Sequence, residues 1–280
     1  MDGQIASPAV TRVTIQAAGA QIEVRRAGKG PPIVCLHATG HGARDFDRLA
    51  ERLGGRFEFF ALDWPGQGDS PREAAPASAA RYAEIVEGAI EQLRLERCLL
   101  LGNSIGGAAA IISAAKHPQQ VRGLVLCKAG GLIGGNLFVR LYCRALARRF
   151  ERGGQGARSF PRWFTRYYRD VLPTEAASWR RDEIVAAGVS AAPVLAEAWR
   201  SFAAPEADTR HLVETLPMPV LYAWGKRDKT LPWALVKSAA RRTPRAEIEL
   251  FDAGHAAFLE TPEAFDAALL RFADGLEAGA

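Results

Sequence analysis

Residues 96–118 have the sequence ERCLLLGNSIGGAAAIISAAKHP, in which a short apolar run meets a glycine-flanked serine and then a run of small residues. The apolar run at 98–101 predicts a buried strand, and residues 108–115 predict a helix that Pro118 ends. The pentapeptide GNSIG at 102–106 predicts a tight turn, because glycine leaves room where the chain bends sharply. This stretch therefore predicts a strand, a turn and a helix, with one serine at the bend.

Strand and helix patterns alternate over most of the chain. Two alternating runs within residues 10–26, separated by a turn containing glycine, predict a hairpin. Alternation of apolar strands with helices is typical of a parallel sheet covered on both faces, so we expect an α/β fold with a mostly parallel, eight-stranded sheet. The expected buried strands are 33–36, 57–62, 98–101, 121–127, 220–224 and 248–251, and the expected helices are 43–53, 78–95, 108–115, 232–242 and one that starts at 261–262.

The alternation is interrupted between residues 130 and 216, where the pattern contains helices and no convincing strand. A Gly-Gly pair bounds this segment on one side and Pro217-Met218-Pro219 on the other. We therefore expect a core domain made of residues 1–129 and 217–280, with residues 130–216 inserted into it as a helical unit.

Three loops that follow strands each present one residue of a hydrolytic set, in the order Ser104, Asp228, His255. A serine hydroxyl attacks a carbonyl only with the help of a neighbouring imidazole, and the imidazole requires a carboxylate to hold its tautomer. Loops at the carboxyl ends of parallel strands meet at one sheet edge, so these residues can form one site. Asp63 and Asp252 compete with Asp228 for the carboxylate position, although both are typical of turns that bond nearby amides.

Five segments, in this order, resemble the successive motifs of the α/β-hydrolase superfamily. The resemblance covers nearly all of the chain outside residues 130–216 and implies an α/β-hydrolase fold, in the serine esterase branch that carries a helical cap. It implies Ser104 as nucleophile, His255 as general base and then acid, and Asp228 as the orienting acid, since residues 97–150 offer no carboxylate after the earlier strand. The five segments are HATG at 37–40, DWPGQGDS at 63–70, GNSIGG at 102–107, WGKRD at 224–228 and DAGHAAFLETPEAF at 252–265.

The resemblance also implies an oxyanion hole formed by the backbone amides of Thr39 and Ile105. The superfamily most often has glycine where this chain has Ala38, and alanine allows a narrower range of backbone conformations. The chain therefore departs from the superfamily pattern directly before Thr39. The 63–70 segment is expected to form a tight connection and to take no part in the chemistry.

Four further histidines are expected to be structural or exposed to solvent: His37, His41, His117 and His211. The four cysteines are expected to be free thiols in a reducing compartment, because they form no C-x-x-C pair and three of them fall in predicted strands. They are Cys35, Cys98, Cys127 and Cys143.

The composition is that of a globular protein, with 48% hydrophobic residues, 24% charged residues and a net charge of +5. The first ten residues, MDGQIASPAV, do not show the basic and apolar regions of a signal peptide, and no apolar run is long enough to cross a membrane, so export is not expected. We expect a soluble, cytoplasmic monomer or homodimer without stable membrane insertion. Nucleic-acid binding is not expected, because no recognition motif accompanies the basic residues.

The predicted insertion is rich in aromatic and arginine residues. Seven aromatic side chains are expected to form mainly its own core, with two or three facing a substrate. Residues 130–181 contain eleven arginines, no lysine and three carboxylates, which favours a solvated helical face. The alternative is that one or two arginines bind an acidic substrate or an anionic surface. The seven aromatic residues are Trp163, Phe164, Tyr167, Tyr168, Trp179, Trp199 and Phe202.

Together these features predict a carboxylesterase-like serine hydrolase that acts on a small-molecule ester through an acyl-enzyme and uses neither a metal nor an organic cofactor. Two alternatives stay open: a carbon-carbon bond hydrolase acting on a dioxo acid, and a catalytically silent ligand-binding protein of the same fold.

Overall fold

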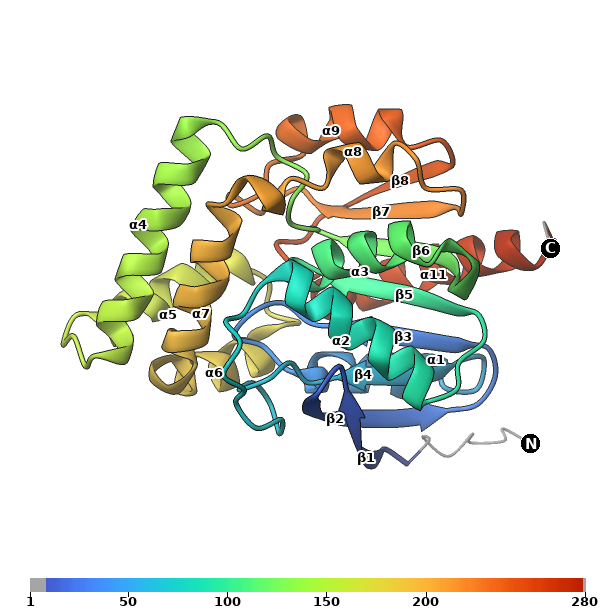
Figure 1. Ribbon diagram of the computed structural model, residues 1–280, viewed down its shortest axis with the longest axis horizontal. Coiled ribbons are helices and arrows are strands. Elements are labelled where there is room, and N and C mark those ends of the chain that lie inside the picture. The colour runs from blue at the N-terminus through green and yellow to red at the C-terminus, as the bar shows by residue number, and fades with distance from the viewer. Residues whose placement is uncertain (1–8, 279–280) are drawn as a thin grey trace.

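A computed structural model describes residues 9–278 of the 280-residue chain. Eight strands form one sheet in the order β1-β2-β4-β3-β5-β6-β7-β8 (Figure 1). The β1/β2 hairpin joins β4 in antiparallel pairing, and all later neighbours are parallel. The predicted fold is thereby confirmed. The strands are β1 Thr11–Ala17, β2 Ala20–Gly28, β3 Pro32–Leu36, β4 Glu58–Leu62, β5 Cys98–Asn103, β6 Val121–Cys127, β7 Val220–Gly225 and β8 Ala246–Phe251.

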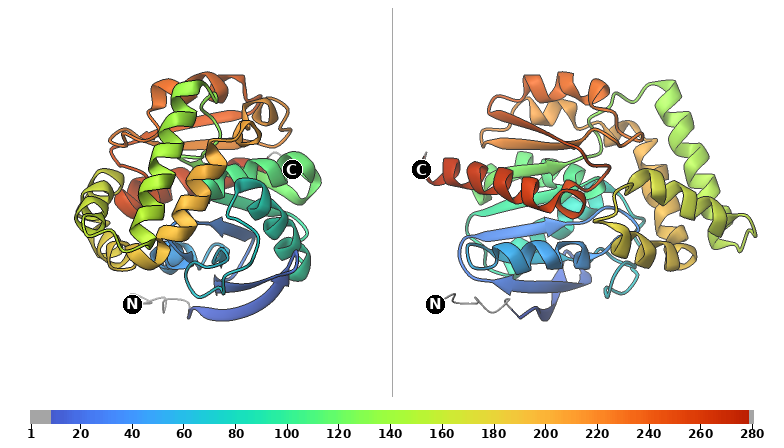
Figure 2. Two further views of the ribbon diagram at one scale, coloured as in Figure 1. Left: turned by 60° about the vertical axis from the view of Figure 1, so that its left-hand side comes forward. Right: turned by 180° about the vertical axis from the view of Figure 1, so that it is seen from behind.

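Helices cover both faces of this sheet, as the alternating pattern predicts. The helices α2, α3, α8 and α9 pack on one face and α1, α10 and α11 on the other, so that each face has its own apolar core (Figures 1 and 2). Their bounds are α1 Asp47–Leu53, α2 Ala79–Gln92, α3 Ile105–Lys116, α8 Arg210–Val213, α9 Trp233–Arg242, α10 Ala257–Glu260 and α11 Pro262–Ala278, with short 3-10 turns at Ala43–Phe46, Pro118–Gln120 and Pro205–Ala207.

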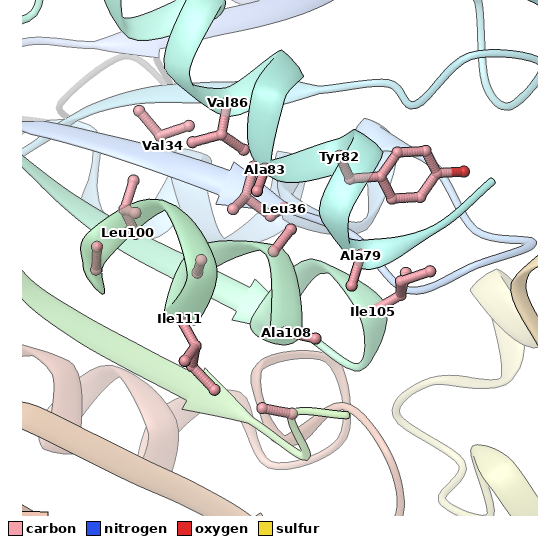
Figure 3. Packing of buried hydrophobic residues seen from close by; sticks show 14 of the residues in the cluster. Val34, Leu36, Ala79, Tyr82, Ala83, Val86, Leu100, Ile105, Ala108 and Ile111 are labelled. Atoms are coloured by element: carbon pink, nitrogen blue, oxygen red, sulfur yellow. The ribbon is translucent and has the colours of Figure 1, made fainter. Parts of the chain in front are cut away.

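The helix α3 lies centrally against the sheet because its inner residues are small. Ala108 and Ile111 pack beside Leu100 of β5, and α2 contributes Tyr82 and Val86 to the same cluster (Figure 3). The helix begins at residue 105, three residues earlier than the sequence pattern predicts. Glycines are weak helix formers in isolation, but here tertiary packing overrides that preference.

Four helices lie beyond one end of the sheet, on the side where α3 begins (Figures 1 and 2). We call them the inserted helices: α4 Leu137–Gly154, α5 Phe160–Val171, α6 Ser178–Ala186 and α7 Gly188–Phe202. The helices α4 and α7 pack along each other, and residues 130–216 contain helices and no strand. The short helix α8, which is the last helix within residues 130–216, instead contacts α3 and α9 on the sheet face.

Candidate active site

Ser104 occupies the sharp bend between β5 and α3, with φ 56° and ψ −117°. Positive φ is unusual for serine, and the surrounding backbone imposes it: the Ser104 amide donates to the Cys127 carbonyl, and its own carbonyl accepts from the Gly130 amide. A Cβ atom on Gly106 would lie 2.2 Å from the carbonyl oxygen of Leu36. The bend expected from GNSIGG is therefore present, and it brings Ser104 into the wall of a cavity.

His255 and Asp228 come together although 27 residues separate them. His255 Nδ1 lies 2.6 Å from Asp228 Oδ2, and the other carboxylate oxygen accepts from the amide and hydroxyl of Thr230, both at 2.6 Å. The His255 amide is also fixed, since it donates to the carbonyl of Val171 at 2.8 Å. With Nδ1 donating to the carboxylate, Nε2 is the ring atom left to accept a proton.

The charge on Asp228 is stabilised in a buried position, where the residue is 4% exposed. Burial alone would raise the pKa of the Asp228 carboxyl, but His255, Lys128 and the Thr230 hydroxyl together hold that pKa well below its usual range. The carboxylate therefore stays ionised and can stabilise a charged imidazole.

The competing aspartates have other partners. Asp63 accepts from the Ala43 amide at 2.6 Å and from the Asp69 amide at 3.0 Å, as the turn interpretation predicts. Asp252 pairs on the surface with Arg227. Of the candidate acids, it is Asp228 that the structure brings to His255.

Of the two predicted oxyanion residues, Thr39 lies on the loop after β3 and Ile105 directly follows Ser104. Ala38 and Thr39 line the same cavity as Ser104, and Ile105 is the first residue of α3, whose amide has no acceptor within its own helix. Outside glycine, the positive φ values among the described residues belong to four positions, and Ala38 is not one of them. Alanine therefore fits here without backbone strain.

Two further side chains support the site, and the sequence pattern did not predict this role for either. Asn103 Nδ2 donates to the carbonyl oxygens of Cys127 at 2.9 Å and of His255 at 2.8 Å, so it joins the loop that carries His255 to the bend at Ser104. Gln67 Oε1 accepts from the Gly40 amide at 2.6 Å. The 63–70 connection is thus tight, as predicted, and it also anchors the loop that carries Thr39. In the sequence, only the positions of these two residues point to a role in the site: Asn103 directly precedes Ser104, and Gln67 lies within the 63–70 motif.

The other histidines occupy the structural or surface positions expected of them. His37 is fully buried, with Nδ1 2.7 Å from the Ala38 carbonyl oxygen and Nε2 accepting from the Trp64 amide at 3.1 Å. His41 is buried with Nδ1 2.6 Å from Asp45 Oδ2, and it also lines the cavity that contains Ser104 and His255. His117 lies at the end of α3, and His211 is exposed. All four cysteines are buried and free, as predicted.

The cavity beside Ser104 and His255 has a volume of about 540 Å³ and is lined by both the sheet loops and the inserted helices. Four of the seven aromatic residues expected in the insertion line it, against the two or three predicted. Of the remaining three, Trp163 and Phe164 pack against Phe150 and Phe160 within the inserted helices, and Trp179 lies under the guanidinium of Arg48 of α1. The four that line the cavity are Tyr167, Tyr168, Trp199 and Phe202.

None of the eleven arginines at 130–181 is among the described residues that line the cavity. Eight of them are exposed, seven on the inserted helices and Arg158 between α4 and α5, in agreement with the solvated face favoured above. Arg180 is buried instead and bonds Asp45, which ties α6 to the loop after β3 at an Nε–Oδ1 distance of 2.5 Å.

The model of the alpha/beta hydrolase family matches residues 33–268, a range that includes every predicted site residue. The chain belongs to the alpha/beta hydrolase family. Within residues 9–278 of this alpha/beta hydrolase, no helix combines the length and the apolar character needed to span a bilayer.

Two relatives of this alpha/beta hydrolase have named activities. It is 26% identical over 264 residues to a 2-hydroxy-6-oxononadienedioate/2-hydroxy-6-oxononatrienedioate hydrolase from Pseudomonas sp, a match that covers 90% of this chain and 91% of the relative. It is 29% identical over 258 residues to a pimeloyl-[acyl-carrier protein] methyl ester esterase from Xanthomonas campestris pv. campestris, covering 89% and 97%.

Solved structures of hydrolases share its fold. A thermophilic esterase from Thermogutta terrifontis has a TM-score of 0.80 at 23% identity, with 95% of this chain and 99% of that one covered. The enol-lactonase from Burkholderia xenovorans LB400 has a TM-score of 0.78 at 19% identity, with 94% and 100% covered. Family and fold together identify the protein as a hydrolase-type α/β protein with esterases among its structural neighbours.

Proposed function

We propose that this alpha/beta hydrolase cleaves carboxylic esters of small or medium size through an acyl-enzyme, with Ser104 as nucleophile. One observation carries the proposal: Ser104 and His255 line the same cavity, and His255 is bonded to the buried carboxylate of Asp228 at 2.6 Å. A serine hydroxyl requires an imidazole oriented in this way within reach before it can attack a carbonyl carbon, and this requirement supports the proposal.

In the proposed reaction, His255 accepts the Ser104 proton as the hydroxyl attacks the ester carbon. The amides of Thr39 and Ile105 donate to the oxyanion that forms. Collapse of this intermediate breaks the ester bond, and the leaving alcohol takes the proton from His255. Water then repeats the attack and releases the acid. Loss of one oxyanion donor typically lowers such rates about 10² to 10³-fold.

The lining of the cavity supports the proposal that it binds the acyl group of the substrate and that this group is apolar. Aromatic and aliphatic side chains dominate its wall, and Phe138 and Leu235 reach it from positions that are 78% and 56% exposed. Apolar pockets of this size hold the greater part of a small ligand. We therefore propose that the inserted helices act as a cap whose inner wall selects the acyl chain.

Replacement of the nucleophile tests the proposal. Ser104→Ala should lower kcat/KM for p-nitrophenyl butyrate by at least about 10⁴-fold while the melting temperature stays near that of the wild type. Ser113→Ala is the matched control, because Ser113 is buried on α3, the helix that Ser104 precedes, and its hydroxyl has no hydrogen-bond partner among residues 9–278. Activity equal to the wild type in Ser104→Ala would contradict the assignment.

The carbon-carbon bond hydrolase is the second candidate, and the relative from Pseudomonas sp favours it. Its substrate is an acid and would need a cation in the pocket, a position that Lys229 alone among the described arginines and lysines could fill. An assay with a 2-hydroxy-6-oxo dienoic acid beside p-nitrophenyl esters of graded length separates the two reactions. For a silent binding protein, neither assay would respond and a fluorophosphonate probe would leave Ser104 unlabelled.

A further inference from the structure

Lys128, the residue after β6, places a buried ammonium group behind the acid of the proposed triad. It is fully buried, and its Nζ lies 3.4 Å from Asp228 Oδ2. The same nitrogen donates to the carbonyl oxygens of Gly225 at 3.0 Å and Leu231 at 2.7 Å, and it lies 5.0 Å from the centre of the Trp224 ring. Every one of these partners belongs to residues 224–231, which we call the acid loop.

The backbone of Lys128 has an unusual conformation. Its φ is 46°, a left-handed value that is uncommon for a residue with a side chain. A buried ammonium without partners would be costly, whereas this one has a carboxylate and two carbonyl oxygens around it. Burial lowers the pKa of Lys128 to about 8, and the charge of Asp228 opposes that decrease. At neutral pH the group is therefore mainly charged.

We propose that Lys128 is a positioning residue of the triad, which ties the acid loop to the end of β6 and shares the Asp228 carboxylate with His255. The proposal rests on the proposed function, since it concerns the same Asp228 and His255. The Asp228 carboxylate thus faces the Lys128 ammonium on one side and the His255 imidazole on the other.

Other ionisable groups near this pair are few. Glu260 on α10 is a second carboxylate that acts on Lys128, and the phenol groups of Tyr142 and Tyr167, from α4 and α5, lie within the electrostatic reach of Asp228. The phenols are neutral at the pH of the reaction, because burial raises the pKa of both.

The positive charge of Lys128 should keep His255 in its neutral, proton-accepting form down to a lower pH than in a protein without that charge. When that charge is removed, the carboxylate stabilises the protonated imidazole more strongly. The acidic limb of the kcat/KM profile should then move upward by about one pH unit.

Two variants separate the effect of the Lys128 charge from the effect of its hydrogen bonds to the acid loop. Lys128→Gln keeps hydrogen-bond donors without the charge, and Lys128→Met removes both. We expect the acidic limb to shift by about one unit in each, with an additional plateau loss of about 10-fold in Lys128→Met alone. An unchanged limb in folded Lys128→Gln overturns the proposal, since a purely structural role would lower the plateau without moving the limb.

A measurement on the wild type covers the case in which the variants do not fold. Lysine labelled with ¹³C at Cε should show one signal that titrates well below the others. A phosphonate adduct on Ser104 that bears a negative oxygen keeps His255 protonated, and coupling between sites is reciprocal. The signal of Lys128 should therefore move to lower pH by about one unit in the adduct, and an unmoved titration refutes the coupling.

The outcomes remain distinct from those for the proposed function. If Ser104→Ala retains activity, the hydrolase assignment fails. If Ser104→Ala is inactive and the Lys128 variants keep the wild-type limb, only the role of Lys128 fails.

Discussion

A single glutamine supports the loop that carries one of the two proposed oxyanion donors. Gln67 is buried, its Oε1 accepts from the Gly40 amide, and its Nε2 donates to the hydroxyl of Tyr82 at 2.9 Å. Tyr82 in turn stacks on Trp64, with ring centres 4.3 Å apart. The Thr39 amide is thereby positioned from a different segment of the chain.

Gln67→Leu should lower kcat for short esters by about 10-fold with a smaller change in KM, because a misaligned amide weakens transition-state binding most. Steady-state kinetics measures both constants. Gln21→Leu is the control, since Gln21 is an exposed glutamine on β2 and its replacement should leave both constants unchanged. Equal constants for Gln67→Leu and the wild type would show that the loop holds its position without this bond.

At the scale of elements, the approach of α3 to the sheet depends on glycine at two positions. A Cβ atom on Gly107 would lie 2.5 Å from the Cβ of Ala129, and one on Gly106 would overlap the Leu36 carbonyl. A side chain at Gly106 would push the start of α3 away from β3, and one at Gly107 would push it away from the segment after β6. Either displacement would take the Ile105 amide with it. The helix start and the oxyanion hole therefore share one steric requirement.

Gly106→Ala should destabilise the protein by about 3 kcal/mol and abolish most activity, because the backbone cannot yield without strain. Gly275→Ala is the matched control: Gly275 lies in α11, is exposed, and has no atom of residues 9–278 within 4 Å of an added Cβ, so this variant should gain up to about 1 kcal/mol of stability. Urea denaturation measures both free energies of unfolding. A Gly106→Ala protein as stable as the wild type is incompatible with this packing.

At the scale of the whole molecule, the buried His37 should make stability depend on pH. Burial lowers the pKa of His37 to about 3, whereas an unfolded histidine has a pKa near 6.5. Between these values the unfolded state binds more protons, so the free energy of unfolding falls as pH decreases from 6.5 towards 3. By pH 5 this amounts to about 2 kcal/mol.

His37→Gln removes that titration and keeps an acceptor for the Trp64 amide. The stability difference between wild type and His37→Gln should therefore shrink by about 2 kcal/mol between pH 7.5 and pH 5. Urea denaturation at both pH values measures it, and contributions from other groups cancel in the comparison. A difference that is the same at both pH values would mean that His37 can be protonated in the folded protein.

Much of this protein follows from local sequence. Apolar runs and glycine turns specify the eight strands, the bend at Ser104 and the loops of Asp228 and His255, because strand formation and tight turns depend on neighbouring residues. The order of these loops along a parallel sheet places them at one edge. Helix starts are less well specified, as α3 shows, since packing outweighs propensity there.

Only the tertiary structure decides which side chains support the site. Gln67 and Gly40 are 27 residues apart, Lys128 and Gly225 are 97 apart, and Asn103 and His255 are 152 apart. No local pattern encodes such pairs, because each exists only after separate segments have packed together. The same reason applies to the cavity, whose wall combines sheet loops with the inserted helices. The sequence by itself determines the proposed chemical groups and their order, and the packed structure determines their partners and the shape of the space they face.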